Sequence, residues 1–397
     1  MKKRLLTLLA SCMLACAIDA AAALAEIPAY TYDIDGGIHG MAVSEDGLVV
    51  FTGMAYRDYG EAENAKQDGY AICIDAQGNE RWRVTQNLHE DGVSLNVMRA
   101  PAFREDGSVT MVLETSFHLD AGGNWDQAEL LRVGASGQIV SRSLMMGEQV
   151  DGLHYINGFG APAALGKNIL LSRSERESDD PTNMQTWMHP TNTYYLYGES
   201  GNRLRTLDAL CALEIDRVSD AHALVIEQDK NTALYAIDGK GNVTRLATAY
   251  TPQGNVYVED LLSLPDGGAA MTGFYWRDEG NESFIRRYDA QGNVVFETKT
   301  GAWRQSGLAK TPNGFAAIGI FGEPLSSGEL SRELMFFDGD GKLVLSRSLD
   351  ELNIAGGGYN IAALPDGSLM VASSVNAADE HSFSQLRVAV IPKEDIP

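Results

Sequence analysis

Cysteine is scarce in this chain, and its scarcity excludes two classes of small, cross-linked fold. Only four cysteines occur in 397 residues, and Cys12 and Cys16 lie close to the N-terminus. A disulfide scaffold needs many cysteines, and a zinc module needs closely spaced cysteines or histidines. Cys73 and Cys211 can form at most one disulfide. Because both lie in or beside apolar segments, we expect buried free thiols.

Basic residues are also few. The sequence has 31 Lys and Arg against 54 Asp and Glu, a formal charge of −23. A field of this sign repels phosphate backbones and anionic lipid headgroups, so we expect neither nucleic acid nor a membrane surface as a partner. Neutral ligands, cationic ligands and calcium remain compatible with it, and acidity also favours solubility.

Long hydrophobic runs are absent beyond the N-terminus. Lys2, Lys3 and Arg4 precede an apolar run that ends at Ala25, which predicts a signal peptide over residues 1–25 and a secreted or cell-envelope protein. The segment ending at Cys12 resembles a lipobox, so a lipoprotein is the less favoured alternative. No later run is long enough for a transmembrane segment. Removing the signal takes away three basic and one acidic residue and moves the charge from −23 to −25.

Helical periodicity of useful length is missing, and a repeated turn takes its place. An Asp-Gly or Asn-Gly pair between short apolar strands supplies the positive backbone angles of a tight hairpin. This first hairpin motif ends at Gly47, Gly107, Gly267, Gly314 and Gly367, with weaker copies near Gly166 and His222.

A second hairpin motif follows the first. It has an acidic residue or Gly three positions before a Gly, between strands rich in β-branched and aromatic residues. Its copies end at Gly78, Gly137, Gly201, Gly241, Gly292 and Gly341. Two hairpins make four strands, and a unit of 40 to 64 residues, counted from the sequence, is in the range of a propeller blade.

The units predict the fold class: an all-β, seven-bladed β-propeller of four-stranded antiparallel blades, with residues 26–397 as a single, monomeric domain. The last unit lacks a fourth strand, whereas the strand-like segment Pro28 to Ile34 is left over at the start. We expect this N-terminal strand to close the last blade and to hide its open edge. Because the third and fourth units are weak, six or eight blades remain alternatives.

The run Ile74-Asp-Ala-Gln-Gly-Asn-Glu-Arg-Trp82 resembles the repeat of the quinoprotein-alcohol-dehydrogenase-like propellers, also called PQQ-like repeats. In that repeat an Asp-x-x-x-Gly turn leads to an aromatic residue on the outer strand. The resemblance implies the propeller architecture over nearly the whole mature chain. It does not imply quinone chemistry, because the adjacent cysteine pair is absent. Trp82 and Phe296 fill the aromatic position, and other residues replace it elsewhere: Ser141, Arg205, Arg245 and Leu345.

Long segments on the face opposite the Gly turns form the expected binding face, since variable loops on a rigid scaffold usually carry function. They are residues 56–68, 117–126, 173–190, 276–282 and 323–332. Trp125, Trp187 and Trp276 fall within them. Aromatic rings beside polar residues suit sugar rings, although tryptophans that pin their own loops are an equally good interpretation.

Counting seven back from the Asp or Asn of the first motif gives a second candidate site. Equivalent positions on the inner strands would converge at the mouth of the central channel, where propellers usually bind ligands. They are His39, Arg99, Glu259, Ser306 and Tyr359, with Asp216 nearby. The alternative is that these polar residues only bind channel water.

No metal or cofactor site is predicted. Calcium is the one candidate ion, because acidic loops near Asp58 to Asp68 and Arg176 to Asp180 offer oxygen ligands without an established spacing. The segment Asp338-Gly-Asp-Gly-Lys resembles part of an EF-hand loop but is better explained as a turn.

Three hypotheses follow. The first is an exported bacterial binding or interaction protein that recognises a glycan, or a protein partner at the cell surface, on the loop face and channel mouth. The second is an extracellular polysaccharide hydrolase or lyase that acts through carboxylates and His39. The third is a structural scaffold of the cell envelope. The sequence leans away from catalysis, because it has no nucleophile elbow, phosphate loop or dinucleotide fingerprint in a supporting context.

Overall fold

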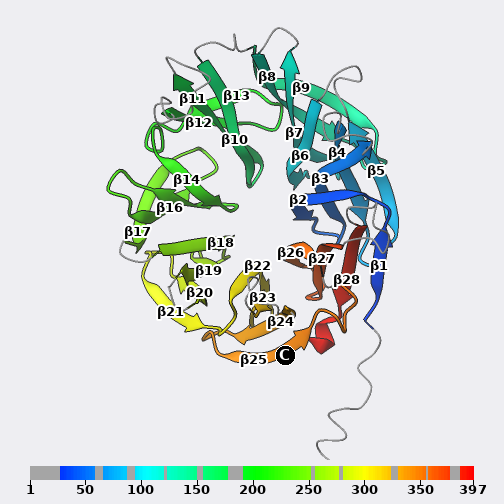
Figure 1. Ribbon diagram of the computed structural model, residues 1–397, viewed down its shortest axis with the longest axis vertical. Coiled ribbons are helices and arrows are strands. Elements are labelled where there is room, and N and C mark those ends of the chain that lie inside the picture. Colours follow the sequence, from blue (N-terminus) through cyan, green and yellow to red (C-terminus); the bar gives the residue numbers. More distant parts are fainter. Residues whose placement is uncertain are drawn as a thin grey trace, which may run out of the picture.

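The protein is an all-β propeller in which four-stranded antiparallel blades are arranged around a central axis (Figure 1). The computed structural model describes residues 27–58, 66–86, 94–119, 123–149, 155–177, 191–251, 255–276, 280–322, 330–354, 356–375 and 385–397. The predicted signal peptide and Cys12 therefore lie outside the described residues. In Figure 1 the colours run once round the ring, so neighbours in sequence are neighbours in space.

Five sheets are separate four-stranded blades. Three of them are β10 (Tyr155–Leu165), β11 (Asn168–Glu177), β12 (Thr191–Tyr197) and β13 (Arg203–Thr206); β14 (Glu214–Val218), β15 (His222–Ile226), β16 (Thr232–Ile237) and β17 (Val243–Tyr250); β18 (Asn255–Ser263), β19 (Ala269–Trp276), β20 (Glu282–Tyr288) and β21 (Val294–Lys299). The other two are β22 (Arg304–Thr311), β23 (Gly314–Phe321), β24 (Ser331–Asp338) and β25 (Leu343–Ser348); β26 (Gly357–Ala363), β27 (Leu369–Val375), β28 (Gln385–Ile391) and β1 (Ala29–Tyr32).

The remaining strands belong to one eight-stranded sheet. They are β2 (Gly36–Val43), β3 (Val49–Asp58), β4 (Lys66–Ile74), β5 (Glu80–Gln86), β6 (Ser94–Phe103), β7 (Val109–Leu119), β8 (Gly123–Val133) and β9 (Ile139–Gln149). β2 to β5 pair antiparallel in order, and so do β6 to β9. Among the described residues one strand pairing joins the two sets, a parallel bridge between Gln67 and Leu95. A short 3-10 helix, η3 (Lys393–Asp395), follows β28.

The N-terminal strand closes the last blade, as the sequence predicts. β1 pairs antiparallel with β28, and Ala29 lies opposite Ala389 (Figure 1). Tyr32 is buried, and its hydroxyl donates a hydrogen bond of 2.7 Å to the carbonyl oxygen of Gly78 in the β4–β5 turn. The strand thus covers the open edge of β28 and is anchored to the neighbouring sheet.

The second hairpin motif forms the predicted turns because its Asp side chain organises them. In four of the six turns one carboxylate oxygen accepts hydrogen bonds from the backbone N–H groups two and four residues later. The four Asp residues are Asp75, Asp238, Asp289 and Asp338. This is the local bonding for which Asp is favoured in turns. The resemblance of the Asp338 segment to an EF-hand loop is therefore explained by a turn.

The glycine of each second turn also holds adjacent blades together. Gly137 has a φ of +86°, and a Cβ added there would lie 2.5 Å from Cβ of Trp82. Gly341 similarly abuts Phe296. In two other units the glycine contacts a different position of the outer strand: Gly201 contacts Ser143, and Gly292 contacts Leu246. The outer strands of those units carry a different residue at the point where the next turn packs.

The core lies between blades rather than inside one. Both faces of the middle strands are apolar, and the buried clusters combine residues of adjacent sheets, such as Leu224 with Met271 and Ala270 with Phe315. Cys73 is buried in one cluster, where burial raises its pKa to about 12, and Cys211 is half-buried. Both are free thiols, in agreement with the expectation from sequence. Within the described residues no helix is long and apolar enough to cross a bilayer.

Candidate functional site

Every innermost strand of the ring is interrupted at an equivalent position. A register shift against the next strand occurs in seven inner strands: β2, β6, β10, β14, β18, β22 and β26. A β-bulge of this kind leaves a residue outside the ladder and redirects its side chain. Each of these strands thus has a residue whose side chain is released from the regular alternation.

The residues predicted to lie at the channel mouth are at or beside these bulges. His39, Asp216 and Glu259 are each the unpaired residue of their strand. Tyr359 lies within the bulge of β26, and the two others immediately precede a bulge: Arg99 and Ser306. In β2 and β18 the unpaired residue lies seven positions before the Asp of the first turn, which is the separation used to select these positions in the sequence.

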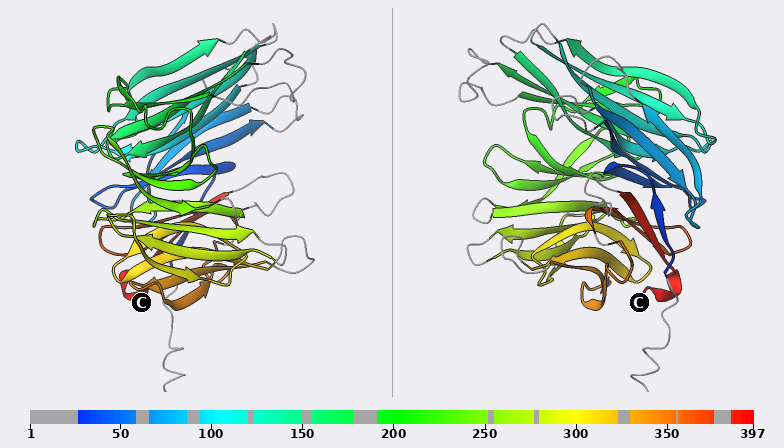
Figure 2. Two further views of the ribbon diagram at one scale, coloured as in Figure 1. Left: turned by 90° about the vertical axis from the view of Figure 1, so that its left-hand side faces the viewer. Right: turned by 45° about the vertical axis from the view of Figure 1, so that its right-hand side comes forward.

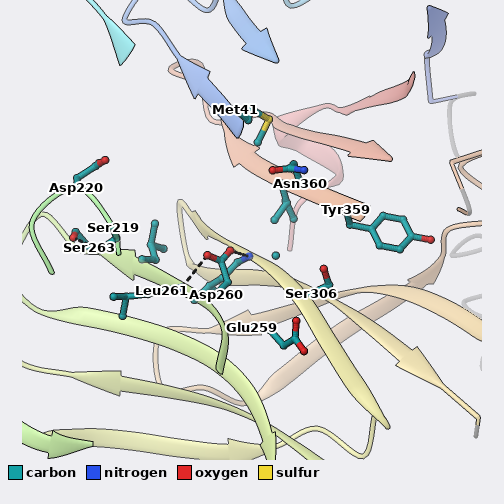
Figure 3. Close-up of a pocket in the computed structure, with 14 residues that line it drawn as sticks. Met41, Ser219, Asp220, Glu259, Asp260, Leu261, Ser263, Ser306, Tyr359 and Asn360 are labelled. Carbon is teal, nitrogen blue, oxygen red and sulfur yellow. Dashed lines mark hydrogen bonds between the residues drawn. The ribbon is translucent and has the colours of Figure 1, made fainter. Parts of the chain in front are cut away.

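Three of these residues line one cavity at the channel. Glu259, Ser306 and Tyr359 come from the adjacent strands β18, β22 and β26 and border a space of about 340 Å³ (Figure 3). Ser219, Asp220, Asp260 and Asn360 add polar groups, and Met41, Leu261 and Ile361 add apolar ones. The phenol of Tyr359 points away from Asp260 in Figure 3, and its hydroxyl is bonded to the backbone of Gly356. Tyr359 therefore shapes the wall.

Asp260 joins two inner strands beneath this cavity. Its carboxylate accepts hydrogen bonds of 2.8 Å from the backbone N–H of Leu261 and from that of Leu308 in β22 (Figure 3). The Leu308 N–H follows the bulge at Gly307, where the ladder is interrupted. Burial raises the pKa of Asp260 to about 6, although both hydrogen bonds lower it. Asp260 is thus a structural clamp with an unusual proton affinity.

This pKa predicts how stability depends on pH. Because the folded-state pKa lies above the unfolded value near 4, the stabilisation is present at low pH and lost as pH rises through about 6. A shift of two units corresponds to about 2–3 kcal/mol. Urea unfolding at several pH values should show the protein losing this amount between pH 4 and 7.5 relative to Asp260→Asn. A pH-independent difference between the two proteins would show that the carboxyl titrates normally.

Asp220 is held over the channel by the neighbouring blade. It sits at the tip of the β14–β15 hairpin, where the first motif is weak. Ser263 of β18 fixes that tip: its hydroxyl lies 2.7 Å from Oγ of Ser219, 3.1 Å from N of Ala221 and 2.9 Å from Nδ1 of His222. The Asp220 side chain is exposed to the channel, yet the surrounding protein raises its pKa.

A larger cleft lies beside the first cavity and shares Glu259 with it. The cleft has a volume of about 680 Å³ and is bordered by β14, β18 and the first residue of β22. Glu259 forms an ion pair with Arg304, with Nε 2.7 Å from one carboxylate oxygen and Nη2 2.9 Å from the other. Asp216 accepts a hydrogen bond of 3.2 Å from Tyr250, and burial raises the pKa of Asp216. Two differently held carboxylates therefore face one cleft.

Aromatic rings form one wall of this cleft. Tyr257 and Trp276 are each 53% exposed, which is high for large aromatic residues. The ring of Tyr257 stacks on Phe274, with centroids 5.2 Å apart, and Trp276 flanks it at 6.1 Å. The predicted Trp276 thus borders the candidate site through Tyr257, although Trp276 itself does not line the cleft.

The other candidates are not brought to these two cavities. His39 and Arg99 are neighbours: burial and then the charge of Arg99 lower the pKa of His39. Arg99 is paired with Glu114 at 2.8 Å. Trp125 lies in β8 opposite Phe117, and its side chain is not among the described parts of the chain. Trp187 lies wholly outside the described residues. The structure therefore groups Asp216, Glu259, Ser306, Tyr359 and Trp276 on one side of the ring.

The channel also opens on the face of the Gly turns. A cavity of about 1030 Å³ lies there, bordered by first-motif turns such as Glu45, Asp46 and Gly107. It shares Met41, Asp220, Leu262, Leu308 and Ile361 with the first cavity, so these residues surround the narrow part of the channel. The sequence predicted only the loop face.

Among the residues that the structure describes, no three His, Cys, Asp or Glu side chains are grouped as a metal site would require. The acidic loops considered for calcium fall largely outside these residues, since 59–65 and 178–190 are not described. Calcium stays an open prediction.

Comparisons with known proteins identify no family for this chain. No protein-family model and no curated protein matches the chain. Two solved structures align over most of it. They are the WD40 β-propeller domain of Doa1 (12% identity, TM-score 0.47, covering 94% of this chain and 99% of that one) and YCF48 bound to D1 peptide (14%, 0.48, 92% and 97%). An α-L-arabinofuranosidase from Fusarium graminearum aligns at 10% identity with a TM-score of 0.42, covering 92% and 99%.

Proposed function

We propose that this chain is an exported bacterial propeller that binds a glycan where the central channel meets the cleft between the β14–β17 and β18–β21 blades. The observation that carries the proposal is the meeting of the two cavities at Glu259, next to the exposed ring of Tyr257. Sugars bind to proteins through a flat aromatic face for their C–H groups and polar groups for their hydroxyls. Both are present here within one concave surface.

We further infer that the ring has seven blades, as the sequence predicted. The eight-stranded sheet divides at the parallel bridge between Gln67 and Leu95 into two antiparallel sets of four. A single bridging pair is what two adjacent blades make where they approach closely. The bulge repeated on seven inner strands supports the same count.

Hydrolysis or lysis of a glycan is the second candidate function. It is favoured by Asp216, whose raised pKa suits a proton donor, in the same cleft as Glu259, which is ion-paired with Arg304. Two carboxyl groups in unlike environments are the usual basis of an acid and base pair. The scaffold hypothesis is less supported, because the channel cavity has polar walls and Trp276 is half-exposed.

Binding can be tested by calorimetry with a panel of neutral and charged oligosaccharides. We expect Tyr257→Ala to weaken binding of any hit by about tenfold, because one stacked ring contributes roughly 0.5–1.5 kcal/mol beyond its buried area. Val344→Ala is the control, since Val344 is exposed to a similar extent, 52%, but lies on the outer strand β25. An equal loss of affinity in both variants, or no binding of any oligosaccharide on the panel, would contradict the proposal.

A further inference from the structure

The cleft is locally basic on an acidic protein. Its lining includes three cationic side chains, Arg217, Lys230 and Arg304, and two carboxylates, Asp216 and Glu259. In the whole sequence acidic residues outnumber basic ones by 54 to 31. A reversed balance at one concave site is therefore a specific feature of the site rather than of the composition.

Both carboxylates of the cleft are already paired. Glu259 is held by two guanidinium nitrogens of Arg304. One carboxylate oxygen of Asp216 accepts a hydrogen bond from the Tyr250 hydroxyl, and Nη1 of Arg217 lies 3.4 Å from the other oxygen. Arg217 also donates through Nε to the carbonyl oxygen of Glu259, at 3.3 Å. These contacts fix the two arginines in place and compensate the negative charge.

Donors remain free after this pairing. Among the described residues, Nη2 of Arg217, Nη1 of Arg304 and the ammonium of Lys230 make no hydrogen bond or ion pair. Two carboxylates lie close in sequence to Lys230, and both are bonded to other residues. Asp229 accepts hydrogen bonds from the backbone and side-chain amides of Asn231. Glu227 is held by Arg245 at 2.7 and 3.1 Å and by the Tyr235 hydroxyl.

Lys230 also occupies a backbone position that favours glycine. Its φ is +63°, at the tip of the β15–β16 turn, where its N–H donates to the carbonyl oxygen of Glu227 at 2.8 Å. In the hairpin turns that repeat along the chain this left-handed position is filled by Gly, for example Gly47 and Gly241. A lysine there has a conformational cost, and such cost is typically retained where the side chain has a function.

The aromatic wall lies on the same cleft as these cations. Tyr257 presents an exposed ring supported from behind by Phe274 and lines the cleft together with Lys230 and Arg217. A ligand that fits must therefore combine a flat, partly apolar ring with an anionic group. Charge-assisted hydrogen bonds from Lys or Arg to a carboxylate are the strongest polar contacts available to it.

We propose that this cleft binds an acidic saccharide, a sugar ring that carries a carboxylate, with the ring on Tyr257 and the carboxylate on Lys230 and the free donors of Arg217 and Arg304. The inference rests on the proposed glycan-binding function and names its ligand class. A short saccharide with one carboxylate is attracted by these direct contacts, whereas the overall negative charge of the protein still opposes long polyanions.

The test uses a matched pair of probes: a disaccharide containing one uronic acid, and its methyl ester, which is neutral but otherwise nearly identical. Calorimetry at low salt should show the acid binding about tenfold more tightly than the ester to the wild-type chain. Lys230→Gly should reduce this ratio to about threefold or less and raise the unfolding midpoint, because glycine accepts the positive φ. Lys240→Ala, which removes an exposed lysine of the β16–β17 turn, is the control and should leave the ratio unchanged.

The outcomes separate the two proposals. Equal affinity for acid and ester, with both lost in Tyr257→Ala, would keep glycan binding and overturn the acidic ligand class. A preference for the acid that survives in Lys230→Gly would also overturn it. No binding of either probe to the wild-type chain would overturn the acidic ligand class, and no hit on the wider panel would overturn glycan binding as well.

Discussion

A chain that begins at Asp35 and therefore lacks β1 should fail to form a stable propeller. The deletion removes the buried side chains of Tyr32 and Ile34 and exposes the edge of β28 to solvent. Burying a large apolar side chain contributes about 1.5–3 kcal/mol. Loss of two such residues and a strand ladder approaches the 5–15 kcal/mol that usually stabilises a domain. Urea unfolding should show a much lower midpoint, or no cooperative transition.

The chain of residues 27–397 is the control for this deletion, because it retains β1. A synthetic peptide of residues 27–34, added to the shortened chain, should restore part of the lost stability by pairing with β28 as an added strand. Equal unfolding midpoints for the chains that start at residues 27 and 35 would show that the last blade is stable with three strands.

Replacing Gly137 by alanine should destabilise the protein by about 2–4 kcal/mol. Roughly 1 kcal/mol comes from the positive φ, which a residue with a Cβ tolerates poorly, and the remainder from overpacking against Trp82. The added Cβ would lie 2.5 Å from Cβ of Trp82, an atom close to the backbone that cannot turn away. Chemical unfolding of the variant measures the effect.

Gly47→Ala separates the two causes. Gly47 has nearly the same φ, +84°, but nothing lies within 4 Å of an added Cβ. We expect the Gly47→Ala variant to lose only the stability that corresponds to the strained φ, about 1 kcal/mol. Equal losses of unfolding free energy in the two variants would show that the contact between the turn and the neighbouring blade does not contribute to stability. The packing of the blades would then depend on the buried clusters alone.

The parts of the fold that depend on local chemistry were predictable from the sequence. Asp-Gly pairs and Asp-x-x-Gly turns mark hairpins because a backbone angle or an Asp side chain determines each of them locally. The closing strand followed from the unmatched segments at the two ends of the chain. His39 and Glu259 were selected by counting seven residues back from Asp46 and Asp266, and both lie at the bulges of their strands.

Contacts between blades were not predictable in the same way. Nothing near Asp260 in the sequence indicates that its carboxylate receives the N–H of Leu308, since the two residues belong to different blades. The contacts of Gly201 with Ser143 and of Gly292 with Leu246 likewise join residues of different blades. Tyr257 lies two residues before Glu259 on β18, but the bulge at Glu259 interrupts the alternation of side chains, so the sequence alone did not place the two together. Lys230 had no usable signal, because its positive φ is evident only in the folded turn.

The pairing of β1 with β28 determines when folding can finish. β1 can pair only after β28, the last described strand, is present. The closing contact therefore joins residues at nearly opposite ends of the chain and has the highest loop-closure entropy cost of any strand pairing in the ring. Until then β28 is an open edge on an otherwise assembled molecule. Ring closure is therefore expected to be the slow, late step of folding, and the period before it is when the chain is most exposed to intermolecular strand pairing.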